Sequence, residues 1–586
     1  MISKAKRIVS DMNIDEKIGQ MLMLALRQWK KDDSSGELQD VTVMNDDIRS
    51  VIGNYHLGGV SLFVENCTDT QQVVHLTYDM QHAAIDKGNL PLLIATDHEG
   101  GNVMRARFAT AFSGNMALGL SGDTNNAYTV GEIIGKELAV LGINSSFGLA
   151  VDVNSNEKNP IIGVRSFSAD ADIVSRMGCA MANGIKSSGI VNCAKHFPGH
   201  GDTAIDSHTG LPCISKSYDE WINTDGAPFN AIIENGKTDV IMTAHIQYPG
   251  LDDTKVYSPA AGKKITVPAT MSRKILTDIL KGNLGFEGVV ITDAMDMDAI
   301  DKQFEIDDAV IRAINAGTDM VLMPVALNSI DDTRKLDQLI ADIKDAIDDG
   351  RLSEERISDA AVRVVSLKEK MNILDKDYDF DPDETAADAL KIVGCQEHRN
   401  IEREIASKCV KLEYEDEFHK FTPRDTDRIV CVMPRSEERF SAEHAFRRMK
   451  EEGKLADVET EFYSYEESWN QIGEDGKHRL AEISTDLLEA VEEADYLIMG
   501  YFQTHDTIGN ANHPRNIAFE EIIKHNNTNN IAIIWEYLPY GTEKYSRDYP
   551  CFVICNSVGM KREDIGKKIY SGRYGPAIPA CIEMMF

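Results

Sequence analysis

Short apolar runs alternate with amphipathic stretches along the first 370 residues of this 586-residue chain. The runs are brief and rich in Val, Ile or Leu, as strands buried on both faces of a parallel sheet are. They are Gly59–Phe63, Leu90–Ala95, Gly189–Ala194, Asp239–Ala244, Gly288–Thr292 and Asp319–Met323. Amphipathic stretches such as Thr68–Lys87 and Met271–Leu280 lie between them. So long a β–α alternation predicts an α/β fold, a (β/α)8 TIM-like barrel. A doubly wound open sheet would give the same pattern and is the structural alternative.

Polar side chains stand directly after four of these runs. They are Asp97 and Glu99 after Leu90–Ala95, Lys195 and His196 after Gly189–Ala194, His245 after Asp239–Ala244, and Asp293 after Gly288–Thr292. In a barrel the C-terminal ends of the strands carry the active site. Four strands that each release polar groups at that end predict one shared pocket.

The chain is too long for one hydrophobic core, because single cores stop growing at roughly 250–300 residues. A helical pattern over residues 353–371 closes the first region, and an acidic, proline-containing segment, 375–384, follows it. The apolar runs then restart. We therefore predict a (β/α) barrel catalytic domain over residues 1–374, a linker over 375–394 and a smaller α/β domain over 395–586.

The chain carries 61 Lys and Arg against 95 Asp and Glu, a formal charge of −34. Such an acidic balance argues against nucleic acid or an anionic membrane as partner, because both would repel it. No apolar stretch resembles a secretory signal or a membrane-spanning helix. The ten cysteines are scattered without a Cys-x-x-Cys pair, which suits reduced thiols. We therefore expect a cytoplasmic protein.

The stretch Lys195–Pro212, KHFPGHGDTAIDSHTGLP, gathers three histidines and two aspartates among glycines and prolines. This composition predicts a shaped loop rather than a helix or strand. One interpretation is a metal site on His196 and His200, but that spacing normally needs a helix, which the intervening proline and glycine disfavour. The other is acid/base catalysis, in which Asp206 orients the imidazole of His208 and stabilises its charged form. We predict the second and expect no metal.

Asp293 follows a buried apolar run directly. As an ordinary structural residue it would cap the N-terminus of the next helix, a position that Asp favours. At the active-site end of a barrel strand, however, a carboxylate can attack an anomeric carbon and form a glycosyl-enzyme. We predict this second role for Asp293, and we interpret Asp296 and Asp298 as first-turn acids of the following helix.

Two further segments carry candidate sugar contacts. In Thr96–Arg105, TDHEGGNVMR, two glycines allow close approach of a ligand, while Asp97 and Arg105 offer an acceptor and a forked donor. In Asn159–Phe167, NPIIGVRSF, Arg165 is the candidate. The structural alternatives are a buried ion pair in the first segment and a clamp at Arg165.

Taken together, these segments resemble glycoside hydrolase family 3, in its β-N-acetylglucosaminidase (β-hexosaminidase) branch. The matching segments, in family order over about residues 10–330, are IDEKIGQM, TDHEGGNVMR, NPIIGVRSF, AKHFPGHGDTAIDSHTGLP, MTAHIQYPGLD, PATMSRKILTDIL and GVVITDAMDM. The KHFPGHG…DSH…LP pattern distinguishes this branch from the family's β-glucosidases, which take a Glu acid/base from a second domain. The chain departs from common family residues at Asn102, often Arg, and at His98, commonly Gln.

The resemblance implies a role for each candidate. Asp293 would be the nucleophile, and His208 the general acid/base, paired with Asp206. The contacts to N-acetylglucosamine would be Asp97, Arg105, Arg165, Lys195 and His196. The second domain, an α/β sandwich in two-domain members, would not supply the acid/base. We also consider homodimer formation as its task.

We therefore expect a retaining exo-β-N-acetylglucosaminidase that needs no cofactor. Its substrate would be a small carbohydrate, a muropeptide or chitooligosaccharide fragment, as in cell-wall recycling. Three alternatives stay open here. A β-N-acetylglucosaminide phosphorylase would use the same residues, because a neutral His does not repel incoming phosphate. A metal-dependent hydrolase would be sensitive to chelators, and a catalytically silent sugar-binding protein would share the fold.

Overall fold

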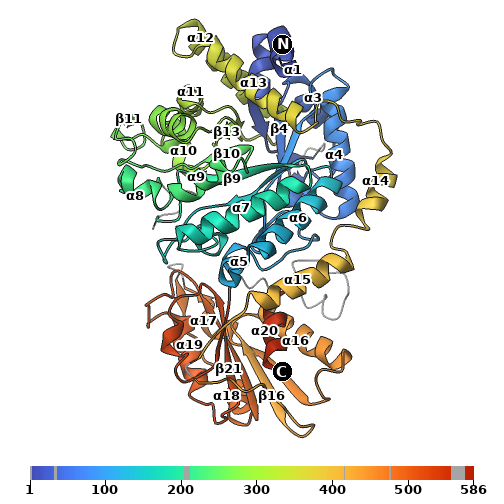
Figure 1. Cartoon of the computed structure of the whole chain (residues 1–586), viewed down its shortest axis with the longest axis vertical. Helices are drawn as coiled ribbons and strands as arrows, with labels where there is room; N and C mark the ends of the chain where they lie inside the picture. The colour runs from blue at the N-terminus through green and yellow to red at the C-terminus, as the bar shows by residue number, and fades with distance from the viewer. Residues whose placement is uncertain (1–2, 32–35, 204–210, 415, 474–476, 556–574) are drawn as a thin grey trace.

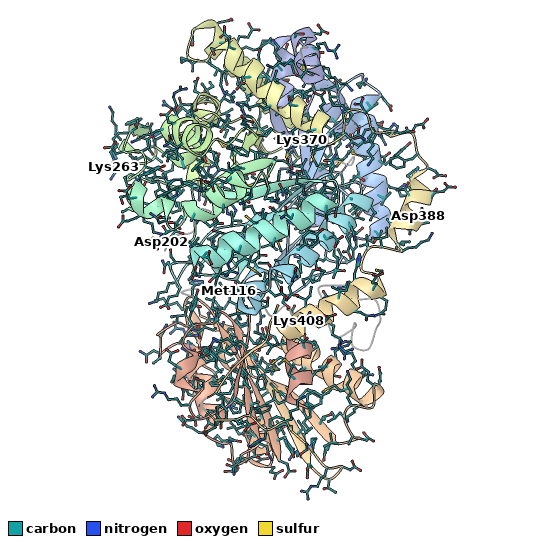
Figure 2. All side chains as sticks on the ribbon, viewed as in Figure 1. Met116, Asp202, Lys263, Lys370, Asp388 and Lys408 are labelled. Carbon is teal, nitrogen blue, oxygen red and sulfur yellow. The ribbon has the colours of Figure 1, made fainter. Side chains whose placement is uncertain are left out.

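The computed structural model describes residues 3–31, 36–203, 211–414, 416–473, 477–555 and 575–586. Two parts are stacked along the long axis, with the blue-to-yellow N-terminal part above and the orange-to-red C-terminal part below (Figure 1). Helices α5 (Asn115–Ser121) and α15 (Gln396–Lys408) lie where the two parts meet. Figure 2 shows Met116 of α5 and Lys408 of α15 at this junction.

Eight parallel strands form the N-terminal part and nearly close into a barrel. In chain order they are β1 (Leu22–Leu24), β4 (Gly59–Leu62), β5 (Leu93–Thr96), β8 (Ser145–Ala150), β9 (Val191–Phe197), β10 (Val240–Thr243), β13 (Val289–Ile291) and β14 (Val321–Leu322). Their order around the sheet is β13-β10-β9-β8-β5-β4-β1-β14. The outer strands β13 and β14 meet through a parallel bridge between Ile291 and Met320. The predicted barrel is therefore confirmed, and the open-sheet alternative is wrong.

All six predicted strands are present, but the pattern of apolar runs misses two others. β1 lies in the apolar run Met21–Leu26, but this run follows the helical pattern of residues 14–20 without a break and does not stand out as a strand. β8, SSFGLA, begins with two serines and forms no conspicuous apolar run. β9 also continues beyond its predicted end through Phe197, so Lys195 and His196 lie in a strand. The prediction of a loop from Lys195 onward is wrong at its first three positions, Lys195 to Phe197, because β9 stays paired with β8 and β10 there.

Apolar side chains from alternating strand positions fill the inside of the barrel. They include Met23, Leu93, Ala95, Phe147, Val191, Cys193, Val240, Met242, Val289, Ile291 and Leu322, all of them buried. The interior is therefore a packed core and not a pore, as in other parallel barrels. A ligand site must consequently lie at one end of the strands.

Helices surround the barrel and place their apolar faces against it (Figure 1). They include α2 (Ile14–Gln20), α3 (Asp46–Asn54), α4 (Thr70–Ile85), α6 (Thr124–Val140), α7 (Ala171–Ser187), α9 (Gly226–Glu234), the π-helical η4 (Lys274–Asn283), α11 (Ile306–Ala316), α12 (Thr333–Asp348) and α13 (Glu354–Lys370). Capping side chains start several of them, as Asn13 does for α2 and Asp69 for α4. No helix in the described ranges is both long and apolar enough to cross a membrane.

The C-terminal part is a three-layer α/β sandwich. Its sheet has the order β15-β22-β21-β20-β16-β17, and only β15 runs antiparallel to its neighbour. The strands are β15 (Lys411–Glu413), β16 (Arg428–Met433), β17 (Glu459–Ser464), β20 (Tyr496–Gln503), β21 (Ile531–Tyr537) and β22 (Cys551–Ile554). Helices α16 (Ser436–Glu451) and α20 (Ala577–Met585) cover one face. Helices α17 (Glu466–Trp469), α18 (Thr485–Glu492) and α19 (Pro514–Ile523) cover the other. The predicted second α/β domain is thus confirmed as a fold.

The predicted linker, 375–394, contains a helix, α14 (Pro382–Ala389). α14 packs against α4 of the barrel and buries Ala386 and Ala389 in the barrel's hydrophobic core. Part of this segment is therefore attached to the barrel surface. The division of the chain at residues 374 and 394 stays a prediction.

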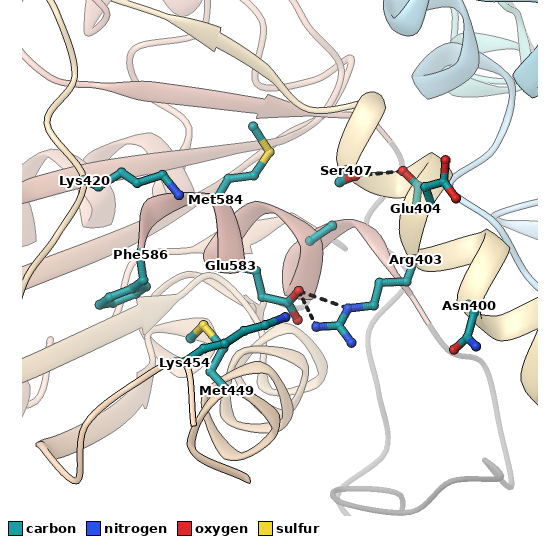
Figure 3. Close-up of a pocket in the computed structure, with 11 residues that line it drawn as sticks. Asn400, Arg403, Glu404, Ser407, Lys420, Met449, Lys454, Glu583, Met584 and Phe586 are labelled. Atoms are coloured by element: carbon teal, nitrogen blue, oxygen red, sulfur yellow. Dashed lines mark hydrogen bonds and ion pairs between the residues drawn. The ribbon is translucent and has the colours of Figure 1, made fainter. Parts of the chain in front are cut away.

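A cleft of about 700 Å³ opens on the C-terminal part between α15, α16 and α20 (Figure 3). Arg403 of α15 spans it, with Nη2 at 2.8 Å from Glu583 of α20 and Nη1 at 2.7 Å from Glu452 at the end of α16. Arg448 of α16 contacts the same Glu583. These ion pairs fasten three helices to one another, so we interpret the cleft as a structural junction.

Candidate active site

The described members of the predicted site gather at the C-terminal mouth of the barrel. Asp97 follows β5, Lys195 and His196 end β9, His245 follows β10, and Asp293 follows β13. Parallel strands bring these ends to one side of the sheet. The structure therefore brings these side chains to the same end of the barrel, while their joint role as a ligand pocket stays a prediction.

Five charged side chains form a continuous series of ion pairs at this mouth. Arg105 Nη2 lies 2.9 Å from Asp97 Oδ2. Lys195 Nζ lies 2.8 Å from Asp97 Oδ1 and 2.8 Å from Glu99 Oε1. Arg165 holds Glu99 with two parallel contacts, Nε to Oε2 at 3.0 Å and Nη2 to Oε1 at 2.7 Å. This series, called the ionic chain below, ties three separate segments of the barrel together.

The pairing keeps these groups charged although burial opposes it. Burial acts to raise the pKa of Asp97, yet Lys195 and Arg105 hold that pKa well below its usual range. Against the same effect of burial, Arg165 and Lys195 lower the pKa of Glu99 to about 2. Burial acts to lower the pKa of Lys195, but the two carboxylates raise it. All three groups are therefore ionised at neutral pH.

Members of the ionic chain differ in how far they reach the surface. The side chains of Lys195 and Glu99 are only 2% and 3% exposed, so they form its buried centre. Asp97, Arg105 and Arg165 keep 21%, 28% and 18% of their side chains exposed. The ion pair considered as the alternative for Asp97 and Arg105 exists, but both groups retain surface that can hydrogen-bond a ligand.

Asp152, just beyond β8, organises the adjoining part of the mouth. Its Oδ2 lies 2.8 Å from Nδ1 of His196, and its Oδ1 accepts the backbone N–H of His200 at 2.7 Å. Although burial opposes it, the neighbouring His196 lowers the pKa of Asp152 to about 2. Nε2 of His196 lies 3.4 Å from Nη2 of Arg165. Asp152 therefore fixes the imidazole ring with its other nitrogen beside the ionic chain.

Asp293 is half-buried and is held by backbone contacts on both sides. Its N–H donates to the carbonyl of Thr243 on β10 at 3.2 Å, and its Oδ1 accepts the N–H of Ala294 at 2.8 Å. His245 Nε2 lies 2.9 Å from the carbonyl oxygen of Ala294. These contacts orient the carboxylate at the strand end without using a charged partner.

The structure contradicts the capping interpretation of Asp293. The next helix, α10 (Asp298–Asp301), starts five residues later, with Met297 in the N-cap position. Asp298 is a first-turn acid of that helix, as expected, whereas Asp296 precedes it and is exposed. The local sequence therefore does not need an acid at position 293 for helix capping.

Asp206 and His208, the predicted acid/base pair, lie outside the described residues. The chain on both sides of them is anchored at the barrel mouth. On one side Asn159 Nδ2 donates to the carbonyl of His200 at 2.8 Å and lies 3.2 Å from Thr203 Oγ1. On the other, the N–H of Gln247 donates to the carbonyl of Pro212 at 2.9 Å.

The two histidines of the metal alternative are engaged elsewhere. Nδ1 of His196 contacts Asp152, and Nδ1 of His200 lies 3.1 Å from Thr203 Oγ1. The end of β9 and a turn, rather than a helix, connect them. Within the described part of the chain, no group of three or more His, Cys, Asp or Glu is placed to hold a metal ion.

Three residues of this mouth were given no specific role from the sequence: Glu99, Asp152 and His245. Glu99 and His245 carry the same signal as the predicted ones, since each follows an apolar run. Asp152 also follows a strand, but β8 is not visible as an apolar run. Finding that strand would have identified Asp152 by the same argument.

Known proteins resemble the chain over both of its parts. The model of the glycosyl hydrolase family 3 N-terminal domain matches residues 13–367. The chain belongs to glycosyl hydrolase family 3. Beta-hexosaminidase A of Pseudoalteromonas piscicida is 39% identical over 443 residues, which cover 73% of this chain and 72% of that relative. A beta-N-acetylglucosaminidase/beta-glucosidase of Cellulomonas fimi is 29% identical over 417 residues, 71% of this chain and 67% of the relative.

A solved family 3 structure extends the match to the second domain. The family 3 beta-N-acetylglucosaminidase from Paenibacillus sp. str. FPU-7 has a TM-score of 0.73 at 26% identity. The match covers 97% of this chain and 95% of that protein. Together these findings confirm the predicted family, its β-hexosaminidase branch and the prediction of a glycoside hydrolase.

Proposed function

We propose that this family 3 protein is a retaining exo-β-N-acetylglucosaminidase. The observation that carries the proposal is the position of Asp293 at the end of β13, in the same barrel mouth as the ionic chain. An oriented carboxylate beside a set of fixed hydrogen-bonding groups is what attack on a bound sugar requires. The β-hexosaminidase relatives favour an N-acetylhexosamine as that sugar.

The terminal sugar binds through the exposed parts of the ionic chain and through His196. Asp97 accepts from sugar hydroxyls, while Arg105 and Arg165 donate to hydroxyl or acetamido oxygens. Lys195 is buried between its two carboxylates, so it fixes the shape of the site more than it meets the ligand. Because these partners hold one another, the site keeps its geometry before the sugar arrives.

Chemistry proceeds in two displacements. His208, paired with Asp206, protonates the leaving oxygen while Asp293 attacks the anomeric carbon from the opposite face. The Ala294 N–H on Oδ1 orients the carboxylate for this attack. Neutral His208 then takes a proton from water, which attacks the glycosyl-enzyme and releases the β-sugar. Two inversions give net retention.

The substrate class extends the same proposal. Muropeptide or chitooligosaccharide fragments with a terminal β-linked N-acetylglucosamine are small carbohydrates that a barrel mouth can take end-on. The scattered cysteines of the sequence suit a reducing compartment, so we place the activity in the cytoplasm.

Hydrolysis of p-nitrophenyl N-acetyl-β-glucosaminide tests the nucleophile. We expect Asp293→Asn to lower kcat by at least about 1,000-fold, because the covalent step is lost. Asp298→Asn is the matched control, since this nearby acid pairs only locally with Lys302 at 2.7 Å, and it should stay within about twofold of wild type. His208→Ala should lower kcat by roughly 10²–10⁴-fold. Full activity in Asp293→Asn would exclude our nucleophile.

Product analysis separates the proposal from its alternatives. Free N-acetylglucosamine as the product, with or without phosphate present, is the expected result. N-acetylglucosamine 1-phosphate in phosphate buffer would instead identify a phosphorylase. Sugar binding without turnover would identify a silent binding protein, and loss of activity in chelator would favour the metal-dependent alternative.

A further inference from the structure

The second domain touches the barrel mouth through the segment 537–540. Leu538 is buried in the barrel's hydrophobic core rather than in the core of its own domain. Its Cδ2 lies 3.5 Å from the position that a Cβ on Gly163 would occupy. Two residues on, the hydroxyl of Tyr540 accepts a hydrogen bond from Asn154 Nδ2 at 2.9 Å. The segment therefore lies on the barrel loop that leads to Arg165.

Tyr537, the first residue of this segment, ends β21 in an unusual conformation. Its φ is +78°, a value that residues with a Cβ rarely adopt. Its ring stacks on Phe502 with centroids 5.0 Å apart and planes inclined by 30°. The guanidinium of Arg435 lies 4.0 Å from the Phe502 ring centre on β20. Strained backbone conformations of this kind often occur at ligand-binding sites, where the surrounding side chains hold them in place.

The phenol of Tyr537 reaches the sugar-binding side of the barrel. The side chain packs against the barrel's hydrophobic core, and the phenol lies close enough to Asn102 and Arg165 for both to act on it electrostatically. Asn102 stands in the turn between β6 (His98–Gly100) and β7 (Val103–Met104), the hairpin that leads from Glu99 to Arg105. Tyr537 is half-buried, so part of its surface is not covered by the protein.

We propose that Tyr537 is a sugar-contact residue that the second domain adds to the barrel pocket. The inference rests on the proposed N-acetylglucosaminidase function and goes beyond it, since that function uses groups of the barrel alone. The phenol hydroxyl hydrogen-bonds a polar group of the terminal sugar, and the ring packs against an apolar face of the pyranose. The second domain thereby contributes to substrate recognition without contributing the acid/base.

Two measurements on the full chain test this contact: binding of free N-acetylglucosamine by calorimetry, and the KM and kcat for p-nitrophenyl N-acetyl-β-glucosaminide. We expect Tyr537→Phe to raise the dissociation constant and the KM by about three- to tenfold, the effect of one lost hydrogen bond. kcat should change by less than about twofold. Tyr537→Ala should weaken binding further, because the ring is also lost. Tyr463→Phe is the control, since it removes a phenol that hydrogen-bonds Glu461 within the second domain at 2.7 Å.

The outcomes distinguish this inference from the proposed function. Unchanged binding and KM in both Tyr537 variants, with an active wild type, would overturn the sugar contact and leave the hydrolase intact. A wild type that binds the sugar but does not hydrolyse the substrate would overturn only the hydrolase, because the binding arm still measures Tyr537. A wild type that neither binds N-acetylglucosamine nor hydrolyses the substrate would overturn both. Tyr537→Phe keeps the ring, so it tests the hydroxyl even if Tyr537→Ala does not fold.

Discussion

Asp152 shows how a single carboxylate can shape the end of a strand. It meets the His196 ring with one oxygen and the backbone N–H of His200 with the other. Because both oxygens are used, the ring orientation and the turn after β9 are coupled. A residue of this kind positions a ligand-binding group without touching the ligand, as supporting groups commonly do in active sites.

His200 gives the stability of the protein a specific pH dependence. Burial, with the nearby His196, lowers the pKa of His200 to about 4 from the usual 6.5. Between pH 6.5 and 4 the unfolded chain therefore binds a proton at this residue that the native state does not bind. The free energy of unfolding consequently falls as the pH falls through this window. At 1.36 kcal/mol per pKa unit, the loss amounts to about 3 kcal/mol.

We expect His200→Gln to flatten this part of the profile. Urea unfolding at a series of pH values should show wild type losing about 3 kcal/mol more than the variant between pH 6.5 and 4. The exposed His75, changed to Gln, is the control and should reproduce the wild-type slope. If the unfolding free energies of wild type and His200→Gln changed in parallel with pH, His200 would take up its proton at the same pH in the folded protein as in the unfolded chain.

At the scale of elements, helix α15 supports the hairpin that carries part of the ionic chain. Glu402 of α15 is fully buried, and its Oε1 accepts the backbone N–H groups of Ala111 and Phe112, each at 2.9 Å. The carbonyl of Ala111 in turn accepts the N–H of Gly101 at 2.7 Å. Gly101 lies in the turn of the β6–β7 hairpin, so a helix from beyond the barrel holds in place a segment that we propose to bind the sugar.

We expect Glu402→Ala to raise KM by several-fold and to destabilise the protein by about 2–5 kcal/mol, because two buried N–H groups lose their acceptor. Glu404→Ala is the matched control on the same helix. Its side chain is exposed and, among the residues that the structure describes, forms an ion pair only with Lys408, so KM and the melting temperature should not change. Steady-state kinetics and thermal unfolding provide both readouts. A destabilised Glu402→Ala with normal KM would show that the helix supports the fold but not the site.

The sequence pattern predicts strands that stand out as separate apolar runs and misses those that do not, such as β1, whose run follows a helical pattern directly. β9 is correctly located, but its last residues are polar because they serve the site, and the pattern therefore ends the strand early. β8 combines serine and glycine with apolar residues, and with it Asp152 is overlooked. Functional residues thus obscure the elements that carry them. Asp206 and His208 lie outside the described residues, so their acid/base role stays a prediction.

At the scale of the whole molecule, the two parts share a hydrophobic core. Ile405, Cys409, Leu538 and Cys555, all beyond the barrel in sequence, are buried in the barrel's cluster. The bond between Asn154 and Tyr540 joins residues 386 positions apart. Periodicity and motifs describe local structure, so contacts of this range could not be predicted from the sequence, although the two folds could.

This shared core predicts that a barrel cut after Leu374 is less stable than the whole chain. We expect its melting temperature to fall by about 5–10 °C, because a large domain shifts about 2–4 °C per kcal/mol and a few kcal/mol of contacts are removed. A longer fragment, residues 1–409, keeps Glu402 and should recover part of the loss. Calorimetry measures the melting temperatures of the whole chain and of the two fragments. Equal melting temperatures would show that the stability of the barrel does not depend on these contacts.

The ionic chain has a consequence for the environment in which the enzyme works. Its three cations and two anions are already paired with one another, and the terminal sugar of the proposed substrate is uncharged. Binding therefore neither forms a new ion pair with the ligand nor displaces counter-ions from the site. The molecule carries a formal charge of −34, and salt screens the charges on its surface. Its affinity for a neutral sugar should nevertheless vary little with ionic strength.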